Sequence, residues 1–443
     1  MYDPLVDSAL APMQPMVNSY WAATTDITTR QPQLQTDLAT DVLVIGAGYC
    51  GLSCAYELAS RFGRNVAVLD ANQPGWGCSG RNAGFVLRGT GRLGLAQLKQ
   101  RYGLDVARQF HAEYGNAVAL VRSRIQSGNI DCAVQENGYF KVAHKASLER
   151  QLPQQVAMLQ RDFDYPAEYL SGQSLKAFMH NTQAFGAIRF PDCFGVNPLA
   201  LAQGYASMAK SAGAQIYHDT PVFSWQRSDS GFVVQTPSAS VECKQIILAT
   251  NAYTAKGFYP ALNTASLPVL SSVIVTEPMT EAQLQGSGLM HNQLVMDTRA
   301  LKYYYRKLPD NRILFGGRSA VHGKDANDPV YPARLLSALK SCFPALQHIK
   351  QAYHWCGWIS VSLDDMPRLC QPEKAVFYAA GYCGSGLSFS TLAGKRLAEL
   401  ASGEALPALP IYQTALKPFP FPQFRRLGQQ AYYQWGRFKD QFL

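Results

Sequence analysis

Three glycines and one acidic residue are spaced as in nucleotide-binding proteins. Gly46, Gly48 and Gly51 form a G-x-G-x-x-G pattern, and Asp70 follows about twenty residues later. In such a pattern the first glycine allows a tight turn, the second lets the backbone approach a pyrophosphate, and the third lets a helix pack closely on a strand. A carboxylate at the position of Asp70 accepts hydrogen bonds from an adenosine ribose. The spacing therefore predicts a dinucleotide site.

The segments around these residues have the patterns needed to position them. Residues 41–45 (DVLVI) form a β-branched run typical of a buried parallel strand, residues 52–62 have helical spacing, and residues 65–69 (NVAVL) form a second strand. The start of the helix would present free N–H groups and a partial positive charge to the phosphates. A complete β–α–β unit favours a dinucleotide site over a chance glycine turn, but it does not separate NAD from FAD.

Two later segments extend the predicted site. Residues 75–84 (GWGCSGRNAG) are rich in small residues, which fits either a flexible surface loop or a loop that runs against a planar ring and its phosphates. Residues 376–380 (VFYAA) form another apolar strand, followed by a glycine turn at 381–386 and a helix through residue 400. This repeats the arrangement of the first motif. Two such helix starts suggest one long ligand held at both ends.

Bulk properties limit the classes of protein. Single cores stop growing at roughly 250–300 residues, so 443 residues predict two domains. The formal charge of +9 comes from scattered residues without a basic run, and we expect no nucleic-acid partner. The ten cysteines form no C-x-x-C pair, which predicts no metal site and a reducing compartment. The sequence shows neither a signal peptide nor a spanning segment, so we expect a cytoplasmic protein.

The chain resembles the D-amino-acid-oxidase-like FAD oxidoreductases, a family that includes sarcosine and glycine oxidases. The resemblance rests on DVLVIGAGYCGLSCAYEL, GWGCSGRNAGFV, GAQIYHDTPV, ILATNAY and GYCGSGLSFSTLAGKRLAEL, and it covers most of the chain. With the N-terminal SYW and the tail FRRLGQQAYYQWGRFKDQF, it is strongest to the γ-glutamylputrescine oxidoreductase subgroup. The resemblance implies bound FAD and the oxidation of a C–N bond to an imine, which is then hydrolysed.

We therefore predict an α/β (α+β) protein of two domains: a Rossmann-like, three-layer FAD-binding domain and an inserted, mainly antiparallel β-sheet domain for the substrate. Residues 266–320 alternate as antiparallel strands do, which supports the second domain. The predicted boundaries are an N-terminal arm at 1–39, an FAD-binding domain at 40–110, 190–255 and 355–405, a substrate domain at 111–189 and 256–354, and a C-terminal tail or helix at 406–443.

The resemblance also assigns cofactor contacts to four groups of residues. One group is the glycine motif with its acid, the second is the small-residue loop, the third holds the adenine, and the fourth begins the last helix at the pyrimidine end of the flavin, where a helix dipole stabilises negative charge. These residues are Gly46, Gly48, Gly51 and Asp70; Ser79, Gly80, Arg81, Asn82, Ala83 and Gly84; Val222, Ala249 and Thr250; and Gly384, Ser385, Gly386 and Leu387.

Substrate contacts are expected from the inserted sheet. Tyr303 and Tyr305 share one face of a predicted strand, and Arg318 ends its neighbour. An arginine offers two parallel donors to a carboxylate, so this cluster suits a carboxylate-bearing substrate. Packing of the tyrosines on the other domain, with a solvated arginine, explains the pattern equally well.

Two departures from the sarcosine oxidases bear on the chemistry. Leu314 occupies the position of a lysine that promotes reaction with oxygen, so the electron acceptor is either oxygen or another acceptor such as a quinone. The position of the cysteine that bonds flavin falls near Gly357, with Cys356 next to it and facing the other way. We therefore predict non-covalent FAD.

Three functions remain open from the sequence. The first is oxidation of γ-glutamylputrescine or a related amine. The second is oxidation or dehydrogenation of an amino acid such as glycine, sarcosine, a D-amino acid or a cyclic imino acid. The third is a membrane-docking flavoprotein that passes electrons to quinone, suggested by the aromatic and basic tail at 417–443. A C-terminal helix packed on the FAD domain is the favoured interpretation of that tail.

Overall fold

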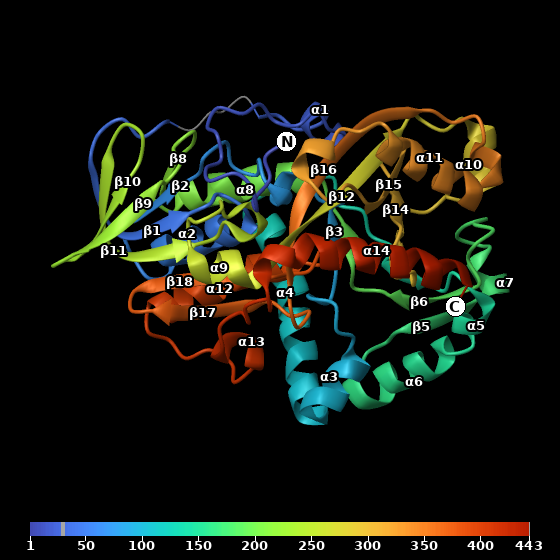
Figure 1. Cartoon of the computed structure of the whole chain (residues 1–443). Coiled ribbons are helices and arrows are strands. Elements are labelled where there is room, and N and C mark those ends of the chain that lie inside the picture. The colour runs from blue at the N-terminus through green and yellow to red at the C-terminus, as the bar shows by residue number, and fades with distance from the viewer. Residues whose placement is uncertain (28–31, 443) are drawn as a thin grey trace.

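Two eight-stranded sheets, side by side, form the frame of the molecule (Figure 1). The computed structural model describes residues 1–27 and 32–442. The first sheet has the order β17-β18-β11-β1-β2-β8, with the hairpin β9–β10 attached to β11. The second has the order β16-β12-β15-β14-β13-β4-β6-β5. The predicted α/β architecture with a second, mainly antiparallel sheet is confirmed.

The β–α–β unit at the start of the first sheet forms as its sequence predicts. Strand β1 (Leu38–Ile45) pairs in parallel with β2 (Val66–Leu69), and helix α2 (Tyr49–Ser60) connects them. Val42 and Val44 point into the core beneath α2, whereas Leu43 and Ile45 point into a core on the opposite face. Burial on both faces explains why the strand reads as a continuous apolar run.

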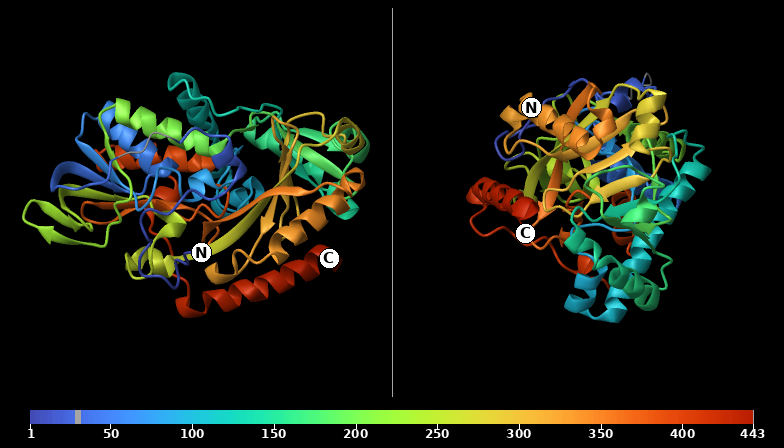
Figure 2. Two further views of the ribbon diagram at one scale, coloured as in Figure 1. Left: turned by 90° about the horizontal axis from the view of Figure 1, so that it is seen from above. Right: turned by 90° about the vertical axis from the view of Figure 1, so that its right-hand side faces the viewer.

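The first sheet lies between two layers. Helices α2, α8 (Pro198–Ser211) and α12 (Leu387–Ala401) cover one face. The hairpin of β9 (Ser224–Ser228) and β10 (Gly231–Gln235), together with α9 (Pro260–Ala265), covers the other (Figure 2). The remaining strands of this sheet are β8 (Gln215–Tyr217), β11 (Ser240–Leu248), β17 (Arg368–Glu373) and β18 (Val376–Ala380).

The second sheet is antiparallel except where β4 (Tyr139–Val142) pairs with β13 (Leu294–Asp297). Helices α11 (Val330–Cys342), α10 (Glu281–Ser287) and α7 (Gly172–Leu175) cover one face and bury a separate apolar core. The other strands are β5 (Glu168–Ser171), β6 (Gly186–Phe190), β12 (Ser266–Thr276), β14 (Tyr304–Lys307), β15 (Ile313–Arg318) and β16 (Gln351–Ser362).

Strand β16 joins the second sheet, although its residues 355–362 were predicted to belong to the FAD-binding domain. Strand β16 pairs with β12 from Gln351 to Ser362, so residues 355–362 belong to the sheet of the substrate side. The first sheet resumes at β17, which begins at Arg368. Pairing along a neighbouring strand is a long-range property that the local pattern of residues 355–362 does not reveal.

Both ends of the chain pack on this frame. In the N-terminal arm, the short helix α1 (Tyr20–Ala23) buries Trp21, whose indole Nε1 donates to the carbonyl of Asn82 over 2.9 Å. At the other end, α14 (Arg425–Phe442) runs along the outside of the molecule (Figures 1 and 2). The remaining helices and strands are β3 (Phe85–Val86), α3 (Leu95–Tyr102), α4 (Leu104–Ser127), α5 (Ala146–Glu149), α6 (Leu152–Phe163), β7 (Phe194–Gly195) and α13 (Pro410–Gln413).

Candidate active site

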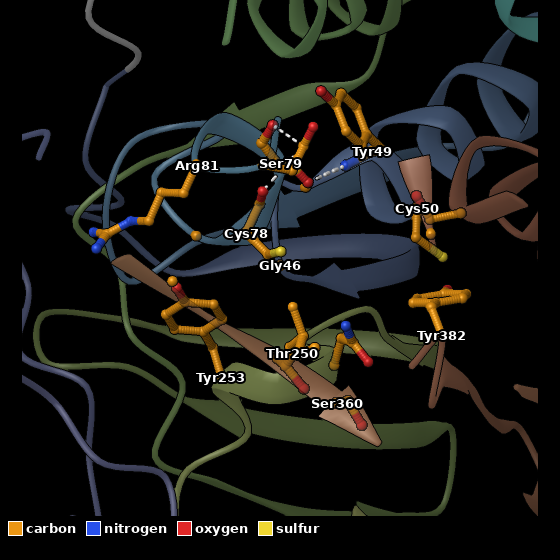
Figure 3. A pocket seen from close by; sticks show the side chains of 18 of the residues that line it. Gly46, Tyr49, Cys50, Cys78, Ser79, Arg81, Thr250, Tyr253, Ser360 and Tyr382 are labelled. Atoms are coloured by element: carbon orange, nitrogen blue, oxygen red, sulfur yellow. Dashed lines mark hydrogen bonds between the residues drawn. The ribbon is translucent and has the colours of Figure 1, made fainter. Parts of the chain in front are cut away.

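A cavity of about 560 Å³ lies between the two sheets and is lined by both glycine motifs. Figure 3 shows one of its walls formed by Gly46, Tyr49 and the segment from Cys78 to Arg81, and the facing wall formed by Thr250, Tyr253 and Ser360. Its size is in the range of small-molecule and cofactor sites. The two helix starts that are far apart in the sequence therefore meet at one site.

The start of helix α2 forms one end of the cavity. Gly48 is its N-cap and makes no side-chain capping bond, while Ser79 Oγ accepts from the backbone N–H of Tyr49 over 3.0 Å. A Cβ on Gly48 would lie 2.8 Å from Ser79 Oγ, and one on Gly46, whose φ is 110°, would lie 2.9 Å from the carbonyl oxygen of Ala249. Glycine at these two positions lets a ligand approach the backbone of this turn closely.

Asp70 is held at the same end by two backbone donors. Its Oδ2 accepts from Ala47 N over 2.6 Å and its Oδ1 from Asn72 N over 2.9 Å. Burial raises the pKa of this carboxyl group to about 6, although the two N–H groups oppose the shift. Lone pairs that these donors leave unused face the cavity and are available to a hydroxyl-bearing ligand.

Three of the predicted cofactor residues lie behind the cavity wall, in close backbone contacts. Gly51, Gly80 and Gly84 do not line the cavity. A Cβ at these positions would lie 1.9 Å from the carbonyl oxygen of Gly46, 2.3 Å from that of Gly75, and 2.0 Å from that of Val196. These glycines permit close approach between backbone segments.

The other predicted cofactor residues do line the cavity. Its wall includes four members of the small-residue loop, the three predicted adenine contacts and the start of α12, where Gly384 has a φ of 90°. Gly386, the N-cap of α12, makes no side-chain capping bond, as at α2. The residues are Ser79, Arg81, Asn82 and Ala83; Val222, Ala249 and Thr250; and Gly384, Ser385, Gly386 and Leu387.

Tyr303 and Tyr305, the tyrosines predicted to contact the substrate, do not line the cavity. Tyr305 stacks on Phe315 and packs edge-on against Phe343 in the core beneath α11, and Tyr303 packs on Phe315 from the same side. Tyr304 faces the cavity instead, and its hydroxyl lies 2.8 Å from Ser271 Oγ. The alternation was correct, but three consecutive tyrosines do not reveal which face is buried in the core.

Arg318 lies in the cavity wall as predicted, and two further cations that the sequence did not single out join it. These are Lys302, just before β14, and Arg92. The side chain of Lys302 is open to the cavity, yet the protein around it lowers its pKa to about 8, first by burial and then through the charges of Lys141, Arg92 and Arg318. Among the described residues that line the cavity, Asp70 is the one acid, and it belongs to the α2 end.

Cysteine placement favours a cofactor held without a covalent bond. Cys356 packs in a separate cluster with Ala252 and Trp358, whereas its neighbour Gly357 lines the cavity. Cys50, Cys78 and Cys383 do line the cavity, but burial raises the pKa of their thiols to about 12, 11 and 11, and a thiol is a poor nucleophile. All ten cysteines are free.

Leu314 does not line the cavity and packs behind its wall. It is fully buried beside Val273, Val275 and Trp355. Across residues 1–27 and 32–442, no cluster of three or more His, Cys, Asp or Glu side chains is arranged to hold a metal ion. In the same part of the chain, no helix has both the length and the apolar character needed to cross a bilayer.

The cavity fits a dinucleotide with a planar ring system. The starts of α2 and α12 both line it, and the positions of Gly46 and Gly48 leave little room for a side chain. Both features suit groups that carry negative charge and approach the backbone closely.

Residues 41–400 match the family model of FAD dependent oxidoreductases (DAO), and the chain belongs to this family. It is an oxidoreductase that acts on CH–NH donors with FAD as its cofactor.

Similar proteins include γ-glutamylputrescine oxidoreductase of Escherichia coli (strain K12), which is 32% identical over 389 residues, covering 88% of this chain and 89% of that protein. Among solved structures, glycine oxidase from Geobacillus kaustophilus has a TM-score of 0.71 at 23% identity, covering 86% of this chain and 100% of that one. L-proline dehydrogenase from P. horikoshii has a TM-score of 0.68 at 19% identity, covering 85% and 96%. These structures share the predicted fold.

Proposed function

We propose that this enzyme oxidises the C–N bond of a small amine that also carries a carboxylate, with γ-glutamylputrescine as the first candidate. The observation that carries the proposal is the cluster of Arg318, Lys302 and Arg92 in the cavity wall; among these three described residues Arg92 alone forms an ion pair, with Asp365 at 3.8 Å. Like charges gathered in a partly buried site repel one another until an anion binds between them. A diamine without a carboxylate would add further positive charge to this site.

Each group of residues has a separate task in the proposed reaction. Arg318 and Lys302 bind the carboxylate and so fix which carbon–nitrogen bond faces the cofactor. Tyr304, held by Ser271, forms the wall between them and the first sheet. Bound FAD supplies the two-electron oxidation. The resulting imine is hydrolysed by water to a carbonyl compound and an amine, or to ammonia when the amine is primary.

We further propose which residues hold FAD. The start of α2, at Gly46 and Gly48, would hold the pyrophosphate, and Asp70 the ribose. The start of α12, from Gly384 to Leu387, would hold the pyrimidine end of the flavin. Backbone groups of Val222, Ala249 and Thr250 would hold the adenine, and the segment from Ser79 to Ala83 would lie along the flavin. FAD would be non-covalent, so acid precipitation should leave a colourless pellet and a yellow supernatant.

The test compares substrates that differ by the carboxylate-bearing group. The purified enzyme is mixed anaerobically with γ-glutamylputrescine or with putrescine, and bleaching of the flavin absorbance is followed. We expect rapid bleaching by γ-glutamylputrescine and at least a hundredfold slower bleaching by putrescine. Equal rates would contradict the role of the cation cluster.

A second candidate substrate class is an amino acid, because the same cations would bind its carboxylate and the chain is similar to glycine oxidase over most of its length. Glycine, sarcosine, proline and D-alanine belong in the same anaerobic comparison. Faster bleaching by one of these than by γ-glutamylputrescine would select the second candidate. The acceptor, oxygen or a quinone, follows from the rate at which each reoxidises the bleached enzyme.

A further inference from the structure

Helix α14 turns an apolar stripe toward solvent. Leu427, Trp435, Phe438 and Phe442 are 60%, 47%, 54% and 64% exposed, and Ala431 continues the same line. Their spacing of three or four residues places them on one side of the helix. Figure 2 shows α14 on the outer edge of the molecule, where no other element covers this side. The solvent-facing side of a packed helix is ordinarily polar, whereas the solvent-facing side of α14 carries this apolar stripe.

The inner face of α14 is polar and fixed by hydrogen bonds. Asp440 accepts from the backbone N–H groups of Ala300 and Leu301 over 2.6 and 3.0 Å. Arg426 donates to the carbonyl of Pro268 over 3.1 Å. Rotating the helix to bury the apolar stripe would break these bonds. The exposed stripe is therefore a stable feature of the fold.

The charges around the stripe select an anionic partner. Residues 417–442 contain five cations, Lys417, Arg425, Arg426, Arg437 and Lys439, and one acid, Asp440; Arg426 is paired with Asp3. The carboxylate of Asp440 already accepts hydrogen bonds from the backbone N–H groups of residues 300 and 301. Arg437 and Lys439 are exposed beside the stripe, and the Lys439 ammonium lies 4.9 Å from the ring centre of Trp435. A second copy would bring the same cations against each other, which disfavours self-association through this face.

We propose that α14 docks this enzyme on an anionic lipid bilayer. A helix with Trp, Phe and Leu on one side and Lys and Arg beside them lies in the plane of a membrane interface, with its apolar side among the acyl chains. The stripe from Leu427 to Phe442 would extend over about 22 Å at 1.5 Å per residue. Juxtamembrane cations add an attraction to anionic lipids that salt screens. Docking in this orientation places the bilayer beside residues 300–302, next to the substrate end of the cavity.

The test is co-sedimentation of the full-length, FAD-loaded enzyme with vesicles. We expect binding to vesicles of phosphatidylcholine with 30% phosphatidylglycerol, little binding to phosphatidylcholine alone, and at least a fivefold loss of binding when NaCl rises from 50 to 500 mM. The variant Trp435→Ser/Phe438→Ser should lose at least 90% of the binding, and Arg437→Gln/Lys439→Gln should bind several-fold more weakly. The variant Phe185→Ser/Met290→Ser, which removes exposed apolar side chains outside α14, should bind as the unmodified enzyme does.

Several results would overturn the proposal. The proposal is wrong if the unmodified enzyme stays in the supernatant with anionic vesicles, or if the Trp435→Ser/Phe438→Ser variant sediments equally well. A third contradicting result would come from sedimentation velocity without lipid. If the unmodified enzyme is a dimer and this variant is a monomer, the apolar stripe binds a second copy of the chain instead of a bilayer. Flavin absorbance checks that each variant is folded, and no substrate is present, so the outcome is independent of the proposed amine oxidation.

Discussion

Lys302 illustrates how position changes the chemistry of a single residue. Nothing in the sequence around residue 302 marks it, since lysines are common beside strands. In the folded chain it lies on the cavity wall with Arg318 and Arg92, and its pKa falls to about 8 because burial and three neighbouring cations disfavour the charged form. An ammonium group with a pKa in this range changes its charge within the working range of many enzymes.

The ammonium form of Lys302 should therefore set an upper pH limit on carboxylate binding. Its pKa lies below the usual value, so the proton is lost as pH rises through about 8, and the dissociation constant of a carboxylate ligand should increase above that pH. Lys302→Met should weaken binding about tenfold or more at pH 7, because a hydrogen bond to a charged group contributes roughly 1.5–3 kcal/mol, and should remove the pH dependence near 8.

The measurement is a spectral titration of the flavin with a carboxylate that lacks an amine, such as benzoate, between pH 6 and 9.5. Such a ligand avoids the titration of a substrate amine. Lys340→Met is a suitable control, since this lysine lies on α11 and outside the cavity lining. Binding that stays constant from pH 6 to 9.5 in the unmodified enzyme would count against this role of Lys302.

At the scale of the element, the orientation of β14 determines which tyrosine faces the cavity. Helix α11 covers one face of the strand, and the other face borders the cavity. Successive side chains therefore point alternately into the apolar core beneath α11 and toward the cavity. Tyr304→Phe removes a hydroxyl from the cavity wall and should lower kcat/KM for the best substrate by about three- to thirtyfold, with the free energy of unfolding changed by about 1 kcal/mol or less.

Tyr303→Phe is the matched control on the same strand. Because Tyr303 lies on the α11 side, this change should leave kcat/KM within about twofold of the original value. Steady-state kinetics and urea unfolding of both variants provide the comparison. A larger kinetic effect from Tyr303→Phe than from Tyr304→Phe would mean that the face assignment is wrong.

The elements around the cavity show what could and could not be predicted from the sequence. The β–α–β unit was predicted closely, because Gly46, Gly48 and Asp70 act within one continuous segment whose periodicity is local. The placement of Lys302 and Arg92 depends on which strands pair and which helices cover them, and neither is a local property. The Gly51, Gly80 and Gly84 positions show the same limit: a glycine that admits a ligand and one that admits another backbone look identical in sequence.

At the scale of the whole molecule, the two ends of the chain are fastened to each other over the cofactor side. Asp3 and Arg426 form an ion pair of 2.7 Å, with side chains 7% and 13% exposed. Asp3 also accepts from the backbone of Gly323, and Trp358 Nε1 donates to the carbonyl of Tyr2 over 2.7 Å. Farther along, residues 8–10 line the cavity, and Gln14 N donates to Asn72 Oδ1 over 2.7 Å. The N-terminal arm thus runs along the cavity, and we call it the strap. The ion pair with α14 holds the first residues of the strap in place.

Breaking this ion pair should loosen the strap and release FAD more quickly. Removing one partner of a buried pair costs about 3–5 kcal/mol because the other charge stays buried without compensation. Asp3→Ala should therefore lower the thermal midpoint and raise the rate of FAD dissociation several-fold, measured as the recovery of free-flavin fluorescence after dilution. Asp105→Ala, which removes the exposed partner of Arg108, should change neither quantity by much, because surface pairs contribute about 0–1 kcal/mol. If Asp3→Ala lowers the thermal midpoint but leaves FAD dissociation unchanged, the pair stabilises the fold without restraining the cofactor, and the strap has no role in retention.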